Sequence, residues 1–303
     1  MSSELKLIER IRRRALLPRA AGLVLGIGDD CAIFRQRGAS DDLLFTTDLL
    51  LEGTHFLRAT HTAADVGWKA LARGLSDIAA MGGAPRFCLV SLGLAPWQTE
   101  RWVEGFYSGL LRLSRREQTP LAGGDLGRGA VAMCDIVVCG SVPRGQALLR
   151  SGARSRDAIY VSGRLGGSAL GLERGKSAAW KKHTRPEPRL ELGRFLRERL
   201  GATAAMDLSD GLSLDLRRLC LASRVAAEIT APPRYRGASL EQALHGGEDY
   251  ELLFTVPERR RVPAEFAGVA LTRIGILRTG RPGAVKLDGQ PLRPLGYDHL
   301  RNS

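Results

Sequence analysis

The chain has 303 residues, enough for two domains or one large one, and 44% of them are hydrophobic, which is ample for a buried core. No apolar run approaches the roughly 20 residues that a membrane-spanning helix requires, and residues 1–17 lack the apolar core and cleavage site of a secretory signal. We therefore predict a cytoplasmic protein with no membrane partner.

The basic charge of the chain, formally +13, does not predict a nucleic-acid partner. Nucleic-acid binding favours a basic stripe interleaved with aromatic side chains, but aromatic residues are only 6% of the chain and do not interleave with its arginines. The charge is compatible with attraction of anionic small molecules. The five cysteines form no CxxC pair, so we expect buried free thiols in a reducing compartment and no zinc site.

The first half of the chain predicts strands and helices in the order β-β-α-β-α-β, closing near Pro143. A short amphipathic surface helix precedes them, with apolar positions at Leu5, Ile8, Ile11 and Leu16. Residues 21–61 predict strand, turn and strand. The first helix follows a possible capping box of Thr62 with Asp65, and the second opens at Pro96, between strands at 86–94 and 131–142.

The second half restarts the pattern after residue 145. We predict strands at 158–163 and 250–256, a helix that begins near Ser168, a helical segment at 190–200, and a turn that feeds a helix within 206–223. Strands and helices alternate here, which is typical of an α/β domain. We therefore expect two domains, residues 1–145 and 146–303.

Aspartates beside glycine or hydroxyl residues, at the ends of apolar runs, are the most informative feature of the sequence. They are Asp29, Asp30, Asp48, Asp77, Asp125, Asp207 and Asp210. Short carboxylates with glycines for close backbone approach suit a hard cation with oxygen ligands. Without metal, acids brought together would repel and some would stay protonated. The pattern indicates a nucleotide site with several Mg²⁺ ions, hence phosphoryl transfer or another ATP-driven reaction.

Two of these aspartates also have ordinary structural interpretations. Asp48 follows Thr46 and Thr47, and hydroxyls with a carboxylate can hold Mg²⁺, but threonines also favour the end of a plain strand. Asp77 lies beside the apolar stripe of its predicted helix, facing the core edge or a cleft. It could instead form an i,i+4 ion pair with Arg73.

The later aspartates leave similar alternatives open. Asp125 lies in a GGD sequence, where backbone and carboxylate could approach a ligand together, or where the chain could simply turn before the next strand. Asp207, Ser209 and Asp210 precede a helix and could be its N-cap.

Glycine-rich segments offer one candidate phosphate site and two false matches. Gly166, Gly167 and Ser168 at a helix start could bind phosphate through free N–H groups. Residues 26–31 begin like a dinucleotide fingerprint but lack its third glycine, and residues 171–177 resemble a P-loop that is one residue too short.

Two further segments look like sites whose ligand the residues alone do not reveal. His55 follows a strand end, although a lone histidine is more often structural. Glu248 and Asp249 precede an apolar strand, with Gly246 and Gly247 before them.

Taken in order, the motifs of this chain resemble those of the thiamine-monophosphate kinase family over nearly its whole length. They are GIGDDCA, TTD, EGTHF, LSDIAAMG, GGD, RSGA, YVSGRLGGSALGL, RPEPR, MDLSDGL, GGEDYELLFTV and GYDHL. LSDIAAMG and SDGL alone would indicate only the wider superfamily that includes aminoimidazole ribonucleotide synthetase and selenophosphate synthetase. GIGDDCA together with GGEDYEL points to the kinase.

The resemblance implies an α/β (α+β) fold like that of aminoimidazole ribonucleotide synthetase, with an N-terminal mixed-sheet domain that dimerises through its sheet and a C-terminal α/β domain. It implies a homodimer that converts ATP and thiamine monophosphate to ADP and thiamine diphosphate by direct in-line transfer assisted by Mg²⁺. No protein general base is expected, because a phosphate oxygen of the substrate is already a nucleophile at neutral pH.

The resemblance also implies three sets of site residues. The magnesium ligands would be Asp30, Thr46, Thr47, Asp48, Asp77, Asp125, Asp207 and Asp210. The residues that contact ATP would be Gly124, Asp125, Arg150 and Ser209, with Tyr107 near the nucleotide. The residues that contact thiamine monophosphate would be His55, Glu248 and Tyr297.

Two other functions are compatible with the motifs. The chain could be another ATP-using member of the superfamily with a different phosphorylated or acidic substrate, or a basic nucleic-acid-binding protein that kept the fold. ATP consumption would distinguish either enzyme from the nucleic-acid-binding protein. A substrate panel would distinguish the thiamine-monophosphate kinase from the other ATP-using enzyme.

Overall fold

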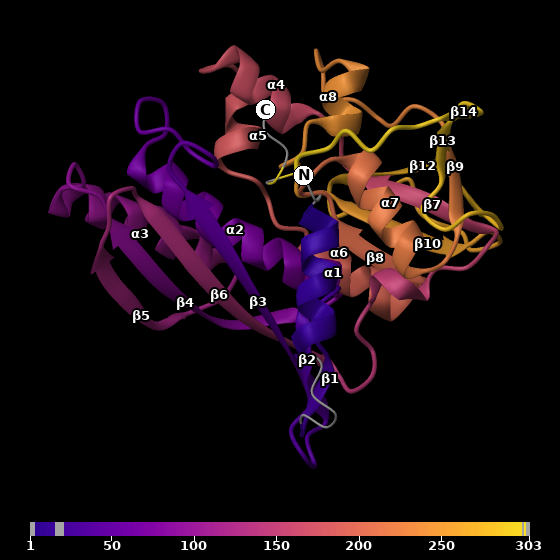
Figure 1. The fold of residues 1–303 in the computed structure, drawn as a ribbon, viewed down its shortest axis with the longest axis horizontal. Helices are drawn as coiled ribbons and strands as arrows, with labels where there is room; N and C mark the ends of the chain where they lie inside the picture. Colours follow the sequence, from indigo (N-terminus) through magenta and orange to yellow (C-terminus); the bar gives the residue numbers. More distant parts are fainter. Residues whose placement is uncertain (1–3, 16–20, 299, 301–303) are drawn as a thin grey trace.

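Two mixed β-sheets, one in each half of the chain, form the frame of the fold (Figure 1). The structure is a computed structural model that describes residues 4–15, 21–298 and 300. The first sheet has six strands in the order β1-β2-β3-β6-β4-β5, and only β4 and β5 pair in parallel. Its strands are β1 (Leu23–Leu25), β2 (Ala32–Phe34), β3 (Asp41–Leu51), β4 (Ala84–Leu94), β5 (Leu121–Arg128) and β6 (Met133–Pro143).

The second sheet has eight strands, ordered β14-β13-β9-β12-β7-β10-β8 with β11 paired to β12. Its strands are β7 (Asp157–Ser162), β8 (Ala204–Asp207), β9 (Ala226–Ile229), β10 (Leu252–Pro257), β11 (Glu265–Phe266), β12 (Val269–Arg278), β13 (Val285–Leu287) and β14 (Gln290–Pro291). The helices are α1 (Glu4–Ala15), α2 (Ala63–Ala80), α3 (Glu100–Arg116), α4 (Gly167–Arg174), α5 (Trp180–Thr184), α6 (Leu190–Phe195), α7 (Leu212–Ala222) and α8 (Leu240–His245). A 3₁₀ turn, Arg150–Gly152, and a π-helical turn, Leu196–Leu200, complete the chain. Within the described ranges, none of these helices is long and apolar enough to cross a membrane.

Helix α2 is the central helix of the molecule. The predicted capping box is confirmed, because Thr62 and Asp65 exchange side-chain and backbone hydrogen bonds at its start. Helix α3 packs against it with almost no space between the two backbones. A Cβ atom added at Gly67 or Gly109 would lie 1.9 Å from a backbone oxygen of the other helix, so only glycine permits this approach.

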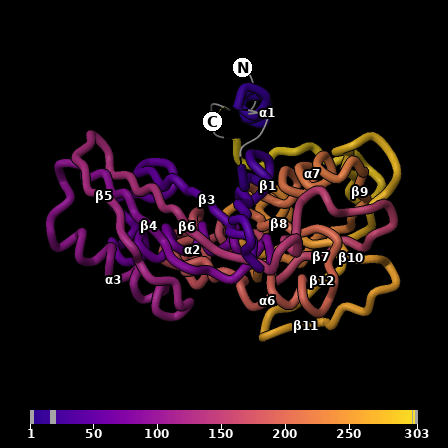
Figure 2. The backbone as a smooth tube through the Cα atoms, turned by 90° about the horizontal axis from the view of Figure 1, so that it is seen from below, coloured from indigo at the N-terminus to yellow at the C-terminus, as the bar shows by residue number. Residues whose placement is uncertain are grey.

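One hydrophobic core runs through both halves of the chain. Helix α2 packs on strands β3, β4 and β6 of the first sheet and also contacts α6 and β8 of the second half. Alternate residues of the second sheet face opposite ways. Ala158 and Phe254 join the core around α2, whereas Ile159 and Leu253 pack in a second core with α7. Figure 2 shows the two halves lying side by side. Residues on both sides of the predicted domain boundary at residue 145 therefore pack in one core. The boundary itself stays a prediction.

Several strands lay outside the sequence prediction. The segment Leu121–Arg128 is an exposed edge strand, β5. The sequence did not predict it because glycines interrupt the apolar alternation that indicates a strand. Residues 204–207 form strand β8, and strands β9 and β11–β14 were also missed. Helix α3 begins at Glu100 with Thr99 as its N-cap, not at Pro96. Helix α1 is confirmed as a surface helix with no buried residue, while Leu16 lies outside the described residues.

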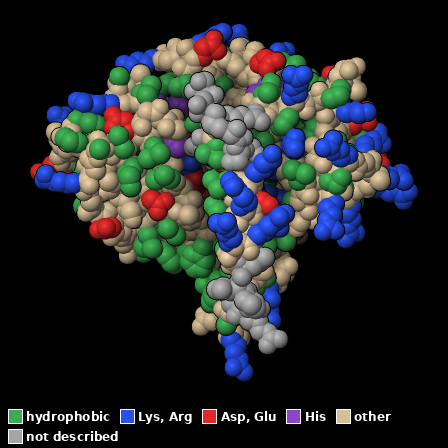
Figure 3. Space-filling model, viewed as in Figure 1, with side chains coloured by type: hydrophobic (Ala, Val, Ile, Leu, Met, Phe, Trp, Pro, Cys, Tyr) green, Lys and Arg blue, Asp and Glu red, His purple; other side chains and the backbone are tan. Residues whose placement is uncertain are grey.

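One face of the first sheet is open. In the view of Figure 1 the strands lie in front and helices α2 and α3 behind them, and Figure 3 shows hydrophobic side chains gathered on this front face. Leu49, Leu89 and Met133 stand on it with 44%, 37% and 40% of their surface exposed. Neighbouring strands in register place these side chains on the same side of the sheet, so the open face carries an apolar patch of the kind that marks an interaction surface.

Candidate functional site

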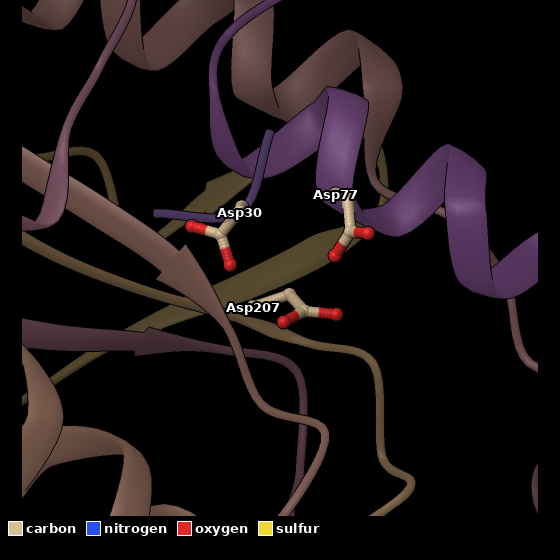
Figure 4. Close-up of side chains that lie close together, drawn as sticks. All are labelled: Asp30, Asp77 and Asp207. Atoms are coloured by element: carbon tan, nitrogen blue, oxygen red, sulfur yellow. The ribbon is translucent and has the colours of Figure 1, made fainter. Parts of the chain in front are cut away.

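Three acids from distant parts of the sequence meet between the two halves (Figure 4). Asp30 comes from the loop between β1 and β2, Asp77 from the last turn of α2, and Asp207 from the end of β8. Each offers a carboxylate oxygen, and these oxygens lie within 4.8 Å of one another. Asp30 and Asp207 are buried and Asp77 is half-buried. The sequence prediction of an aspartate cluster therefore holds for these three.

The cluster carries more negative charge than its surroundings neutralise. Burial raises the pKa of Asp77 and Asp207 well above the ordinary value, and the neighbouring carboxylates raise it further. Hydrogen bonds from Thr46 to Asp77 and from Ser76 to Asp207 (2.7 Å) oppose this shift without cancelling it. A hard divalent cation with oxygen ligands would supply the missing positive charge.

The three residues of the TTD motif do not act together. Thr46 points toward α2 and donates to Asp77, whereas Thr47 points to the open face and donates to Asp135 at 2.7 Å. Asp48 lies on the Thr46 side and pairs with Arg73 at 3.1 Å. Its Oδ2 atom is buried and has no hydrogen-bond partner in the described part of the chain, and burial raises the pKa of Asp48. The strand alternation thus separates Thr47 from the acid cluster. It also directs Arg73 to Asp48 rather than to Asp77.

Arg150 closes the acid cluster on its other side. Its guanidinium contacts Asp30 at 2.5 Å, and its backbone N–H donates to Asp29 at 3.2 Å. Burial and the charge of Asp30 raise the pKa of Asp29 to about 7. The sequence motif RSGA therefore brings a cation to the first aspartate pair.

The aspartates before α7 are not its N-cap. Gly211 occupies the cap position, and no side chain among the described residues caps the helix. The backbone N–H of Asp210 donates to Asp215 at 3.0 Å, and Arg218 holds the Asp210 carboxylate. The pKa of Asp215 is raised to about 7, first by burial and then by Asp210. The predicted capping alternative is therefore wrong, and Asp207 and Ser209 remain available to the cleft.

A pocket of about 280 Å³ gathers most of the residues predicted for the site. Its lining includes Asp48, His55, Arg73, Asp77, Asp207, Ser209, Asp210, Glu248 and Tyr297. Figure 3 shows histidine and acidic side chains in a hollow between the two halves. A second pocket, of about 480 Å³, shares Ser209 and Asp210 with the first and is also lined by Arg12, Arg150 and Arg218. The first pocket is mainly acidic, whereas in the second the three arginines are matched by three acids, Glu4, Glu9 and Asp210.

Three of the predicted nucleotide and metal residues lie away from the acid cluster in the structure. Tyr107, Gly124 and Asp125 line a separate pocket of about 400 Å³ at the β5 edge of the first sheet. Asp125 is exposed and accepts a hydrogen bond from its neighbour Leu126 at 2.9 Å. Strand β5 lies three strands from β3, a separation of about 14 Å. Asp125 is therefore in a strand rather than a turn, and a single chain does not bring it to the acid cluster.

A buried lysine that the sequence analysis missed organises the other end of the pocket. Lys69 is completely buried, and its Nζ contacts Glu248 at 2.7 Å and the backbone oxygen of His55 at 3.0 Å. Burial opposes the charge of Glu248, but Lys69 and His183 lower its pKa below the ordinary value. The signal was present in the sequence, since Lys69, Arg73 and Asp77 recur every four residues on one face of α2.

At the helix start, two of the three N–H groups predicted to bind a phosphate are already engaged. The Asp249 carboxylate already accepts hydrogen bonds from the N–H groups of Gly166 at 2.6 Å and Ser168 at 3.1 Å. The two adjacent acids Glu248 and Asp249 therefore have different roles. Glu248 lines the pocket, and Asp249 binds the N–H groups at the start of helix α4.

Comparison with known proteins identifies the family. Residues 28–145 match the family model described as AIR synthase related protein, N-terminal domain. The chain is 41% identical over 304 residues to the thiamine-monophosphate kinase of Escherichia coli (strain K12), with 91% of this chain and 92% of that protein covered. The chain belongs to the thiamine-monophosphate kinase family. The resemblance predicted from the motifs is thereby confirmed.

Solved structures of thiamine-monophosphate kinases share the fold. A structure described as "AaThiL complexed with AMPPCP and TMP" is 33% identical, with a TM-score of 0.87 and coverage of 98% of this chain and 97% of that chain. The enzyme from Stenotrophomonas maltophilia K279a is 37% identical, with a TM-score of 0.76 and coverage of 95% and 97%. The predicted fold class, a mixed α/β fold like that of aminoimidazole ribonucleotide synthetase, is confirmed.

Proposed function

We propose that this chain is a kinase that transfers the γ-phosphoryl group of ATP to thiamine monophosphate, giving thiamine diphosphate and ADP. The observation that carries the proposal is the acid cluster of Asp30, Asp77 and Asp207, two of which line the 280 Å³ pocket, within a family whose members bear this activity in their names. The relative solved with AMPPCP and TMP supports the same pair of substrates.

We propose Mg²⁺ as the metal, held by Asp30, Asp77 and Asp207, with Asp48 and Asp210 in the pocket that Asp77 and Asp207 also line. The donor set fits, because these are oxygen ligands only, the pKa values of Asp77 and Asp207 are raised, and the buried Oδ2 atom of Asp48 has no hydrogen-bond partner among the described residues. Bound there, Mg²⁺ would offset the negative charge of the phosphate groups during transfer.

The residues of the chain then bind and orient the reactants. Glu248, His55 and Tyr297 line the acidic pocket, and Glu248 keeps its charge beside Lys69, which suits the cationic ring of thiamine monophosphate. Arg150 and Ser209 line the second pocket, whose arginines suit a polyphosphate. No residue need remove a proton, since the substrate phosphate oxygen is itself the nucleophile. Orientation and electrostatic stabilisation supply the catalysis.

We further propose a homodimer formed through the open face of the first sheet. Leu49, Leu89 and Met133 form an apolar patch there, and Asp125 shares that face. The β5 pocket with Tyr107 and Gly124 lies at the edge of the same sheet. A second copy packed on the sheet would therefore lie close to residues that the family resemblance assigns to ATP and metal but that one chain leaves apart from the site.

The remaining assignments are proposals of the same kind. A cytoplasmic location is supported by the five buried free cysteines. An N-terminal unit that ends at residue 145 is supported by the end of the matched family model.

A substrate panel tests the proposed function directly. The purified chain should consume ATP and form thiamine diphosphate with thiamine monophosphate and Mg²⁺, at or below the roughly 1–100 s⁻¹ usual for kinases. Free thiamine should not react, because its hydroxyl would need an activation that the site does not supply. ATP consumption with an aminoimidazole precursor instead, or phosphorylation of thiamine, would contradict the proposal.

A further inference from the structure

Arg73 is a cationic side chain in the acidic pocket whose hydrogen-bonding capacity is only partly used. Helix α2 turns Lys69, Arg73 and Asp77 toward the site at intervals of four residues. Lys69 is already engaged by Glu248 and by the backbone oxygen of His55. Among the described residues that line the 280 Å³ pocket, Arg73 is the only lysine or arginine.

The hydrogen bonds of Arg73 leave part of its guanidinium group unused. One terminal nitrogen donates to the backbone oxygen of Leu49 at 3.0 Å, and the other pairs with Asp48 at 3.1 Å. Nε is buried and finds no hydrogen-bond partner within the described residues. A guanidinium has five N–H donors, and a buried donor without a partner is costly. The group therefore has donor capacity for a ligand in the pocket.

The positive charge of Arg73 matters for binding an anionic ligand in this acidic pocket. Burial opposes the guanidinium charge, but nearby Tyr250 and Asp48 raise the pKa of Arg73 above its ordinary value, so the side chain stays cationic. A phosphate monoester carries a charge of about −1.5 to −2 at neutral pH. The carboxylates of the pocket would repel such a group, and a planar guanidinium matches its oxygens better than any other side chain does.

We infer that Arg73 binds the phosphate of the acceptor substrate, thiamine monophosphate, and holds it against the acid cluster. The inference rests on the proposed function. It assigns opposite charges to two parts of one pocket, with Arg73 for the substrate phosphate and Glu248 for the cationic ring. Asp48 fixes the guanidinium by its ion pair. The pocket thus matches a substrate that is positive at one end and negative at the other.

The test compares two ligands that differ only in the phosphate. Calorimetry measures the dissociation constants of thiamine monophosphate and of thiamine for the full chain with Mg²⁺ and a non-hydrolysable ATP analogue. In Arg73→Gln the affinity for thiamine monophosphate should fall by about tenfold or more, the scale of a lost charged hydrogen bond, while the affinity for thiamine stays the same. Arg73→Lys should keep part of the preference. Arg115→Gln, which removes the same charge from the exposed end of α3, should behave as wild type.

A second readout does not depend on substrate. Arg73 competes with metal for Asp48, so Arg73→Gln should bind Mg²⁺ alone at least as tightly as wild type does. Equal loss of affinity for both thiamine ligands would show a structural role and overturn the inference, as would an unchanged preference in a folded variant. If Arg73→Gln does not fold, Arg73→Lys decides by the same comparison. A wild-type chain that binds neither ligand would contradict the proposed function instead.

Discussion

Ser76 donates a hydrogen bond of 2.7 Å to Asp207 across 131 residues of sequence, and both side chains are buried. The bond joins helix α2 of the first half to the end of strand β8 in the second. Because Asp77 follows Ser76 on the same helix, this contact sets the position of two of the three acids of the cluster. The site is therefore built only when the two halves are packed together.

Ser76→Ala should weaken metal binding as well as stability. Removing the hydroxyl leaves a buried carboxylate without its donor, which costs about 1–3 kcal/mol. Thermal unfolding with and without Mg²⁺ and ATP measures both effects. Ser114→Ala is the matched control, since Ser114 is also a buried helical serine, but it lies on α3 and donates to the backbone oxygen of Thr119 at 2.7 Å rather than to an acid of the cluster. It should lower stability alone. An identical Mg²⁺ response in the two variants would contradict the role assigned to Ser76.

Nucleotide should stabilise the chain only together with metal. An acid cluster repels free ATP and accepts the magnesium complex, so the melting temperature should rise with ATP and Mg²⁺ and hardly change with ATP and chelator. At about 100 times the dissociation constant the added stability is about 2.7 kcal/mol.

Asp77→Asn should shrink the Mg²⁺-dependent stabilisation and abolish turnover while the metal-free fold remains as stable as wild type, because a repelling buried charge is gone. Asp288→Asn, at an exposed turn, should change neither. A salt-sensitive stabilisation of the same size with chelator present would favour attraction by the basic surface over a metal site.

Asp249 should make stability depend on pH. Burial raises its pKa from 3.8 to about 7 in the folded chain, so the folded state binds this proton more tightly than the unfolded state does. Its contribution is fully present below about pH 4 and is lost as the pH rises to about 7. Asp249→Asn removes that loss but weakens the cap of α4 by about 1 kcal/mol.

Relative to wild type, the Asp249→Asn variant should therefore gain stability steadily between about pH 4 and pH 7. Denaturant unfolding across this range measures the difference. A difference that does not change with pH would mean that Asp249 titrates normally in the folded chain.

Leu89→Glu should break the proposed homodimer. Leu89 stands on the open face of a central strand, and a charge there would be buried without a partner in the assembly. Light scattering after size-exclusion chromatography should give a dimer for wild type and a monomer for the variant. Leu57→Glu replaces a similarly exposed leucine, 45% exposed, outside that sheet and should stay dimeric. A wild-type monomer at micromolar concentration would exclude the dimer.

Local motifs predicted the parts of the site that depend on local chemistry. The capping box at Thr62 and the acids Asp30, Asp77 and Asp207 could be named because their neighbours are glycines, hydroxyls and helix caps. That these acids meet follows from tertiary packing, and it was expected only through the chemistry of metal ligands and the family resemblance.

The sequence could not place residues whose roles depend on strand neighbours. Thr47 and Asp48 are adjacent in the chain but face opposite sides of β3, and Asp125 belongs to an edge strand whose glycines hide it. Lys69 escaped notice because a buried lysine looks like a surface residue until its partner is known. Glu248, 179 residues later in the sequence, is that partner.

The single core around α2 limits how this molecule can move. Leu71 of the helix and Phe254 of the second sheet belong to one continuous cluster, so swinging the halves apart would expose apolar surface that each half now covers for the other. Calorimetry should accordingly record one cooperative melting event rather than two. Ligand exchange then falls to peripheral segments, above all α1, which contributes Glu4 to the rim of both pockets and buries no residue of its own.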